Sequence, residues 1–234
     1  MSNYSEIIDP YTRLTVAQAK LIQIELAGKV KIAGTVEPEN VQLIAGVDAS
    51  ISVDKKSMIG VIAILNWPTL DLNHVYVDTL PVSFPYIPGY LSFREIPVLL
   101  KVAEQITTRP DLVIVDGQGI AHPRRIGLAS HLGLLTGWKT IGCAKSRLIG
   151  DCQEPGKNRG SFKKCIYHNE RIGSILRTRE SVKPVWVSPG TGIDFDSSNE
   201  WILRTATKYR LPDPIRAAHN SGSKFRQGFT EKPR

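Results

Sequence analysis

The sequence has few cysteines, no long apolar run and no secretion signal at its start. Its 234 residues include three cysteines, Cys143, Cys152 and Cys165, whose spacings fit no zinc-ligand set and no CxxC pair, so we expect reduced structural thiols. No stretch approaches the ~20 apolar residues of a membrane helix. The opening MSNYSEIIDP has neither the basic nor the apolar segment of a secretion signal. These absences predict a cytoplasmic protein that does not associate with membranes.

The charge balance is basic. Lys and Arg number 30 against 22 Asp and Glu, a formal charge of +8 at pH 7, which favours a polyanionic partner because neutralised phosphates release counterions. Half of this surplus lies in residues 216–234, which hold five Lys or Arg and one acidic residue. This segment reads as irregular, so we expect either a solvated terminus or an arm that contacts phosphates. The predicted organisation is one domain over residues 1–215 and a flexible basic tail over 216–234.

The first half of the chain predicts a helix followed by three strands. Apolar residues at Ala19, Ile22 and Leu26 have the spacing of one helical face and predict a helix over 15–26 opened by Thr15. Runs rich in Val and Ile, separated by polar turn segments, predict an antiparallel three-stranded meander over residues 41–52, 58–65 and 74–84.

The second half alternates helices and strands. The pattern predicts helices at 93–106 and 127–136 and strands at 111–116, 139–144 and 184–190; residues 171–178 fit either a helix or a strand. Residues 195–209 predict a terminal helix capped by Asp196 or Ser197. Because alternation implies parallel pairing, we predict an α/β domain whose mixed central sheet joins the meander to parallel strands and is flanked by helices.

Two aspartates occupy unusual positions. Asp48 interrupts the apolar strand pattern IAGVDASIS, and Asp116 ends the strand LVIVD at the carboxyl edge, where open α/β sheets place their ligands. Local turns or ion pairs are the alternative explanation for both. Glu95 follows Ser92 by three residues, the spacing of a helix capping box, so a structural role is open to it as well. If the three carboxylates converge, they can hold Mg²⁺ and support phosphodiester hydrolysis.

These carboxylates lie in motifs that resemble endonuclease V, the deoxyinosine-specific repair nuclease. The matching segments are GVDAS, PYIPGYLSFRE and DGQGIAHPRRIGLASHLGLLTGWKTIGCAKSRLIG, and the similarity runs from Leu14 to Arg216. The resemblance implies an RNase H-like fold, Mg²⁺ or Mn²⁺ as cofactor, and cleavage of the second phosphodiester bond 3′ to deoxyinosine. It assigns Asp48, Glu95 and Asp116 as metal ligands.

The resemblance also implies a wedge that enters the duplex and a pocket for the flipped base. The wedge positions are Pro85, Tyr86, Ile87 and Pro88, and the pocket positions are Gly89, Leu91, Gly117, Leu128 and Leu148. Inserted apolar groups recover part of the unstacking cost, and glycine permits close approach of a planar base. A rigid loop over the core and ordinary core leucines are the alternatives.

Lys145 takes its role from the resemblance, whereas His122 and Arg124 take theirs from their positions six and eight residues beyond Asp116. Lys145 matches an active-site lysine that holds the scissile phosphate or the water near the carboxylates, and His122 and Arg124 are expected to contact the backbone of the bound strand. Surface or loop positions without function are the alternatives. His131 is expected to be structural.

The sequence departs from the family at Thr191, where a histidine usually follows the SPG turn near the metals. A hydroxyl does not replace an imidazole, which puts full activity in doubt. Asp194 is therefore considered as an accessory metal ligand, with a turn or helix-entry role as the alternative.

The primary expectation is an endonuclease acting on deoxyinosine-containing DNA as a monomer. The alternatives are an inosine- or distorted-DNA-binding protein that cleaves weakly, an endoribonuclease acting on inosine-containing RNA, and a general RNase H-like nuclease or junction resolvase.

Overall fold

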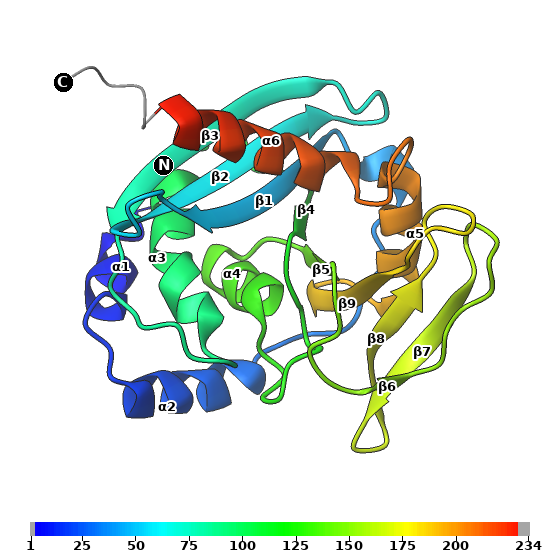
Figure 1. The fold of residues 1–234 in the computed structure, drawn as a ribbon, viewed down its shortest axis with the longest axis horizontal. Helices are drawn as coiled ribbons and strands as arrows, with labels where there is room; N and C mark the ends of the chain where they lie inside the picture. The colour runs from blue at the N-terminus through cyan, green and yellow to red at the C-terminus, as the bar shows by residue number, and fades with distance from the viewer. Residues whose placement is uncertain (1–2, 229–234) are drawn as a thin grey trace.

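The structure is a computed structural model that describes residues 3–228, built around one mixed sheet (Figure 1). The strands in this part of the chain are β1 (Leu43–Ile51), β2 (Ser57–Asn66), β3 (Leu72–Pro81), β4 (Leu112–Val115), β5 (Thr140–Ala144), β6 (Asp151–Cys152), β7 (Phe162–Tyr167), β8 (Glu170–Leu176) and β9 (Val185–Thr191). Their order in the sheet is β3-β2-β1-β4-β5-β9-β8-β7-β6.

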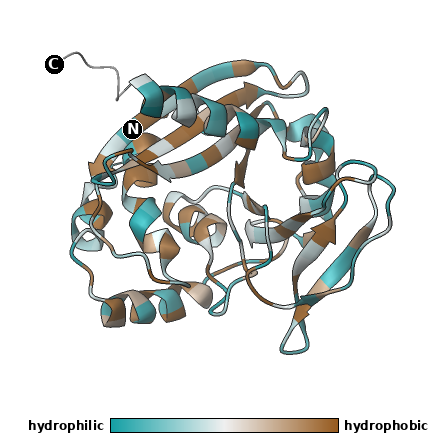
Figure 2. Ribbon diagram, in the orientation of Figure 1, coloured by the Kyte–Doolittle hydropathy of each residue, from teal (hydrophilic) through white to brown (hydrophobic). Residues whose placement is uncertain are grey.

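Helices cover both faces of the sheet. They are α1 (Ser5–Tyr11), α2 (Val16–Ala27), α3 (Leu91–Ala103), α4 (Leu128–Thr136), α5 (Phe195–Thr205) and α6 (Asp213–Gly228), with a short 3-10 helix at Pro38–Asn40. Alternate residues of β1 face opposite layers: Val47 packs in the core under α3 and α4, whereas Ile44 packs with residues of α5 and α6. The centre of the sheet is therefore buried on both sides, and β4 is apolar along its length (Figure 2).

The predicted fold class is confirmed. β1, β2 and β3 form the antiparallel meander, and β1 pairs in parallel with β4, which pairs in parallel with β5. The first predicted helix is α2, capped by Thr15 in a capping box with Gln18. The ambiguous segment 171–178 lies largely in a strand, β8.

Two local predictions are wrong. The cap of α5 is Asp194, whose side chain accepts from the amides of Asp196 and Ser197, the two residues proposed as caps. Cys152 and Cys165 lie opposite each other on β6 and β7 and form a disulfide across a separation of 13 residues, so they are not reduced thiols. The spacing of the cysteines does not indicate this pairing, because it depends on β6 and β7 lying side by side, and neither strand was predicted. Cys143 is free and buried.

The segment expected to be irregular from residue 216 is helical as far as Gly228, the last of the described residues. Ile215, Ala218 and Gly222 are buried and share one helical face, which packs on β1 and β2 (Figure 1). The proposed boundary after residue 215 thus falls inside a helix, and the end of the predicted tail, residues 229–234, lies outside the described residues.

None of the helices in residues 3–228 is long and apolar enough to cross a membrane. The cytoplasmic location and the monomeric state stay predictions.

Candidate active site

Asp48 lies within β1, next to Asp116, which directly follows the last residue of the adjacent parallel strand β4. Val47 of β1 is aligned with Val115 of β4, and the Asp116 amide donates to the Val47 carbonyl at 2.9 Å. Each aspartate is the next residue after this aligned pair, so the register brings both carboxylates to one place. The exposed fractions of the two side chains are 13% and 11%.

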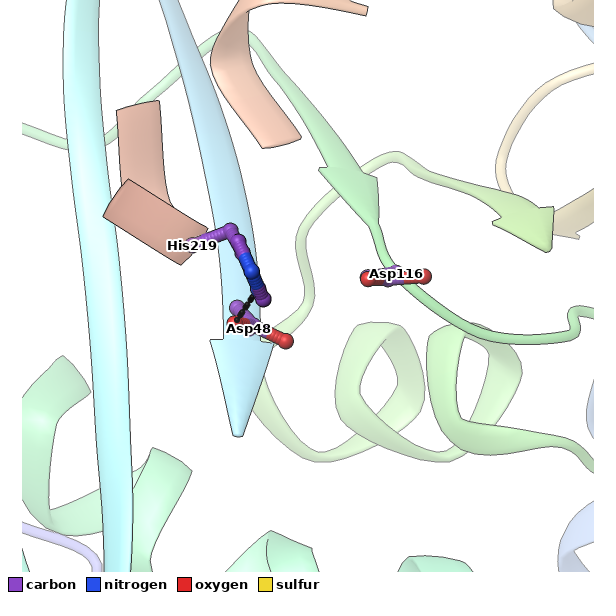
Figure 3. A group of neighbouring side chains, drawn as sticks. All are labelled: Asp48, Asp116 and His219. Atoms are coloured by element: carbon purple, nitrogen blue, oxygen red, sulfur yellow. Dashed lines mark hydrogen bonds and ion pairs between the residues drawn. The ribbon is translucent and has the colours of Figure 1, made fainter. Parts of the chain in front are cut away.

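His219 of α6 lies against this pair of aspartates (Figure 3). Its Nδ1 is 3.0 Å from Asp48 Oδ2, and one ligand atom from each of Asp48, Asp116 and His219 lies within 4.8 Å of the other two. His219 was not among the predicted site residues because the segment from residue 216 was expected to be irregular. The i, i+3, i+7 spacing of Ile215, Ala218 and Gly222 was the sequence signal that could have predicted a helix here.

A glycine of β1 allows α6 to approach the sheet this closely. A Cβ atom added at Gly46 would lie 1.9 Å from the carbonyl oxygen of Pro214, in the first turn of α6. Any side chain at Gly46 would therefore push the helix away from the strand. The close approach places His219, five residues beyond Pro214, beside Asp48.

Glu95 faces the same region from α3. It is half-buried, and within residues 3–228 its carboxylate forms no hydrogen bond or salt bridge. The capping box that offered it a structural role does not form, since the N-cap residue of α3 is Tyr90 and makes no side-chain cap bond. Ser92, the proposed box partner, has its hydroxyl 3.1 Å from Nδ1 of His131 instead. The capping explanation of Glu95 is therefore wrong.

The carboxylates repel one another. Burial, then the charges of Asp48 and Asp116, raise the pKa of Glu95 to about 8. Burial and the charge of Asp116 also raise the pKa of Asp48, while the hydrogen bond from His219 opposes this change. An oxygen-rich set of this kind fits a divalent cation, because hard cations prefer carboxylate oxygens and offset the repulsion among them.

Lys145 lies at the other side of Asp116. It follows the last residue of β5 directly, and its Nζ forms a salt bridge with Asp116 Oδ2 while its side chain stays 45% exposed. The predicted active-site lysine is thus next to the carboxylates, with its ammonium group open to a ligand.

A cavity of about 430 Å³ opens beside the carboxylates, a volume suited to a small ligand or a base. Its lining includes Glu95, Asp116, Lys145 and all five predicted base-pocket residues, Gly89, Leu91, Gly117, Leu128 and Leu148. We call residues 85–89 the wedge loop. Tyr86, Ile87 and Pro88 of this loop also line the cavity, and Tyr86 is 70% exposed.

His122 and Arg124 contact the wedge loop. His122 is 5% exposed, and both side chains reach the carbonyl oxygen of Gly89. Burial, then the charge of Arg124, lowers the pKa of His122 to about 4, so its imidazole is neutral at pH 7 and adds no charge that could neutralise a phosphate. This arrangement differs from the predicted contacts with a bound strand.

His131 is structural, in line with its prediction. It is fully buried on α4, and its Nε2 is 3.0 Å from the hydroxyl of Tyr11. Burial lowers the pKa of His131 to about 3.

Thr191 and Asp194 lie away from the carboxylates. Thr191 is aligned with Thr140 at the start of β5, whereas Asp116 lies at the level of Cys143, three residues further along, roughly 10 Å at the rise of a strand. Asp194 lies beyond the end of β9, where it caps α5. The carboxylate of Asp194 thus has the helix-entry role that was the alternative for it, and its role as an accessory metal ligand stays a prediction. The position of Thr191 gives no sign of a histidine missing beside the carboxylates.

Comparison with known proteins gives one consistent result. The family model of endonuclease V matches residues 24–220. A protein named endonuclease V from Dictyoglomus thermophilum is 50% identical over 181 residues, which cover 77% of this chain and 78% of that protein.

Solved structures of the same family share the fold. The endonuclease V structure from Streptomyces avermitilis has a TM-score of 0.88 and 37% identity, with 92% of this chain and 95% of that chain covered. The Ciona intestinalis endonuclease V was solved with a 24mer DNA containing an inosine followed by a ribo-adenosine; it has a TM-score of 0.81 and 26% identity, with 92% of this chain and 98% of that chain covered.

Proposed function

The chain belongs to the endonuclease V family of metal-dependent deoxyribonucleases, and we propose that it recognises deoxyinosine in DNA and hydrolyses the second phosphodiester bond 3′ to that base. The observation that carries the proposal is the position of three carboxylates next to a cavity lined by an exposed aromatic loop. The carboxylates can then hold the reacting phosphate through a metal ion, while the cavity holds the base.

Asp48, Asp116 and Glu95 are the proposed metal ligands, with Mg²⁺ as the expected ion and Mn²⁺ as a substitute. When bound, the ion activates water and offsets charge on the leaving oxygen of the phosphodiester. Asp48 lies within β1, Asp116 is tied to this strand by its amide bond to the Val47 carbonyl, and His219 restricts the Asp48 carboxylate through its contact with Oδ2. Glu95 lines the same cavity as Asp116 from a separate helix, α3, and is proposed to complete the set.

Lys145 is proposed to hold a non-bridging oxygen of the scissile phosphate. Its salt bridge to Asp116 keeps the ammonium group beside the metal ligands, and its exposure leaves donors free for a phosphate. A charged donor of this kind positions the reacting bond and stabilises the charge that develops there.

The flipped hypoxanthine is proposed to enter the cavity between Gly89 and Gly117. A Cβ at Gly117 would contact the Leu128 side chain at 3.3 Å, so glycine keeps this wall thin and its backbone accessible. Backbone amides and carbonyls can distinguish hypoxanthine, with its O6 acceptor and N1–H donor, from adenine, in which these roles are exchanged. Tyr86 is proposed to fill the vacated stack, where an apolar group recovers part of an unstacking cost of roughly a few kcal/mol.

The test is a labelled duplex with one deoxyinosine, incubated with Mg²⁺ and the intact protein, Asp48→Ala or Asp116→Ala. We expect one nick at the second bond 3′ to the lesion by the intact protein and none by the variants. No nick by the intact protein, or equal nicking by the variants, rejects the proposal. Equal cutting of an unmodified duplex would instead indicate a general RNase H-like nuclease.

Inosine-containing RNA is a second candidate substrate. The DNA bound to the Ciona intestinalis protein carries a ribo-adenosine after its inosine, which motivates a direct comparison of the two sugars. Cleavage of matched inosine DNA and inosine RNA, side by side, ranks the two substrates. The alternative of weak cleavage loses its motive, because Thr191 lies away from the carboxylates.

A further inference from the structure

Three side chains converge on one carbonyl oxygen at the base of the wedge loop. The Gly89 oxygen accepts from Gln23 Nε2 at 2.9 Å and from Arg124 Nη2 at 2.7 Å, and it lies 3.0 Å from His122 Nε2. A carbonyl oxygen has two lone pairs, so three donors saturate it. Three separate side chains thus fix a single loop atom.

The hydrogen bonds define the state of the imidazole. The backbone amide of Arg124 donates to His122 Nδ1 at 3.2 Å, which leaves the proton of the neutral ring on Nε2. Nε2 therefore donates to the Gly89 carbonyl. The three contacts are mutually compatible without a charged histidine.

Gln23 is unusual for its helix. It is 0% exposed although α2 leaves Leu21 and Ile24 67% and 55% exposed. Its amide nitrogen donates to Gly89, and its amide oxygen accepts from Nε of Arg124. Burying an amide is costly unless its groups are paired, so Gln23 is matched to these two partners.

The loop backbone is shaped to receive these donors. Gly89 has a φ of +79°, and the Tyr90 amide donates to the Ile87 carbonyl at 3.0 Å, which closes a turn with glycine at its third position. A Cβ at Gly89 would lie 3.1 Å from Nη2 of Arg124. The guanidinium carbon of Arg124 also lies 4.3 Å from the centroid of the Tyr90 ring. A side chain at Gly89 would strain the turn and crowd Arg124.

We propose that Gln23, His122 and Arg124 are positioning residues that hold the wedge loop at a fixed place relative to the metal ligands. This inference rests on the proposed function of the wedge. His122 and Arg124 belong to the segment that starts at Asp116, so one short stretch of chain links a metal ligand to the wedge loop. A loop that is already ordered loses less entropy on binding, so the contacts should favour duplex binding more than the chemical step.

Gln23→Met tests this inference, because it keeps the size of the side chain and removes both amide contacts. We expect the KM for the deoxyinosine duplex to rise roughly tenfold, with kcat changed less than about twofold. Gln23→Glu keeps the acceptor for Arg124 and loses the donor to Gly89, so its KM should lie between those of the intact protein and Gln23→Met. The same change at Gln105, whose amide donates to Asp78, is the matched control and should leave both constants unchanged.

Amide hydrogen exchange on the DNA-free protein gives a second readout. Gln23→Met should accelerate exchange selectively in residues 85–90, and Arg124→Lys, which loses the planar fork, should do the same if Gln23→Met folds poorly. Unchanged exchange and KM, or equal acceleration throughout the chain, would overturn the inference. If the intact protein makes no nick, the proposed function fails, while exchange still decides whether these contacts hold the loop.

Discussion

Two regions of the site differ in their electrostatics. At the acidic end the carboxylates of Asp48, Glu95 and Asp116 repel one another, whereas at the wedge end three side chains converge on the Gly89 carbonyl. Glu95 has no hydrogen bond within residues 3–228 and a pKa raised to about 8, while Gly89 accepts from Gln23 and Arg124 and contacts His122. The acidic end has three carboxylates against one ammonium group, that of Lys145, whereas the Gly89 carbonyl at the wedge end is already fully paired. The first therefore requires a cation, and the second is ordered before any ligand arrives.

Glu95→Gln should have the largest effect, because it should abolish the function of the acidic end without changing the stability of the protein. Loss of a charged metal ligand should reduce nicking of the deoxyinosine duplex by about a thousandfold. Because the raised pKa keeps the metal-free carboxyl largely protonated at pH 7, the neutral amide should leave the melting temperature nearly unchanged. The measurements are initial nicking rates and thermal melts, with Glu180→Gln at an exposed position as control. A large fall in melting temperature would contradict this account of Glu95.

Tyr86→Ala should affect binding and leave the acidic end intact. The side chain is 70% exposed, so its loss should not change the melting temperature. It should weaken binding of the deoxyinosine duplex by about 30-fold, because the gap in the stack is no longer filled. Fluorescence anisotropy with inosine-containing and unmodified duplexes measures the change. Equal weakening for both duplexes would assign Tyr86 to nonspecific contact.

The wedge end should lose stability in acid through His122. Its folded pKa of about 4 is below the ordinary value of 6.5, so the unfolded chain binds more protons between these values. The contribution is complete above pH 6.5 and is lost as the pH falls towards 4. His122→Gln keeps a donor for Gly89 and does not titrate, so between pH 7 and 5 the intact protein should lose about 2 kcal/mol more of its unfolding free energy than the variant. Urea unfolding at both pH values measures this, and parallel losses would refute it.

Asp194→Ala should have the smallest effect, because it lies outside both ends. Removal of the α5 cap should lower the unfolding free energy by about 1 kcal/mol. Nicking and its dependence on Mg²⁺ should match those of the intact protein. A shifted Mg²⁺ dependence would return Asp194 to the metal site.

The sequence was informative where function depends on strand ends. The apolar run before Asp116 and the interrupted pattern at Asp48 predicted two unusual aspartates in one sheet, and the β1–β4 register brings them together. Positions that depend on packing between distant segments were not predictable in this way. His219 reaches Asp48 only because α6 rests on Gly46, a contact between residues far apart in the chain.

Thr191 is the opposite case, a residue that was assigned to the metal site from its motif but lies elsewhere. Its place in a motif suggested a missing metal ligand, but the antiparallel pairing of β9 with β5 carries it to the other end of the strands. The direction of a strand decides which end of the sheet its last residues reach, and the hydrophobic pattern of the sequence does not reveal that direction. The disulfide between Cys152 and Cys165 was missed for a related reason, since cross-strand pairing decides it.

Calorimetric titration of the DNA-free protein with Mn²⁺ tests the central claim most directly. The intact protein and Tyr86→Ala should bind the ion with equal affinity, whereas Asp48→Asn and Glu95→Gln should lose most of this binding, because the two carboxylates are proposed ligands and Tyr86 is not. Equal binding by all four proteins, or no binding by the intact protein, would contradict the assignment of the carboxylates as a metal site.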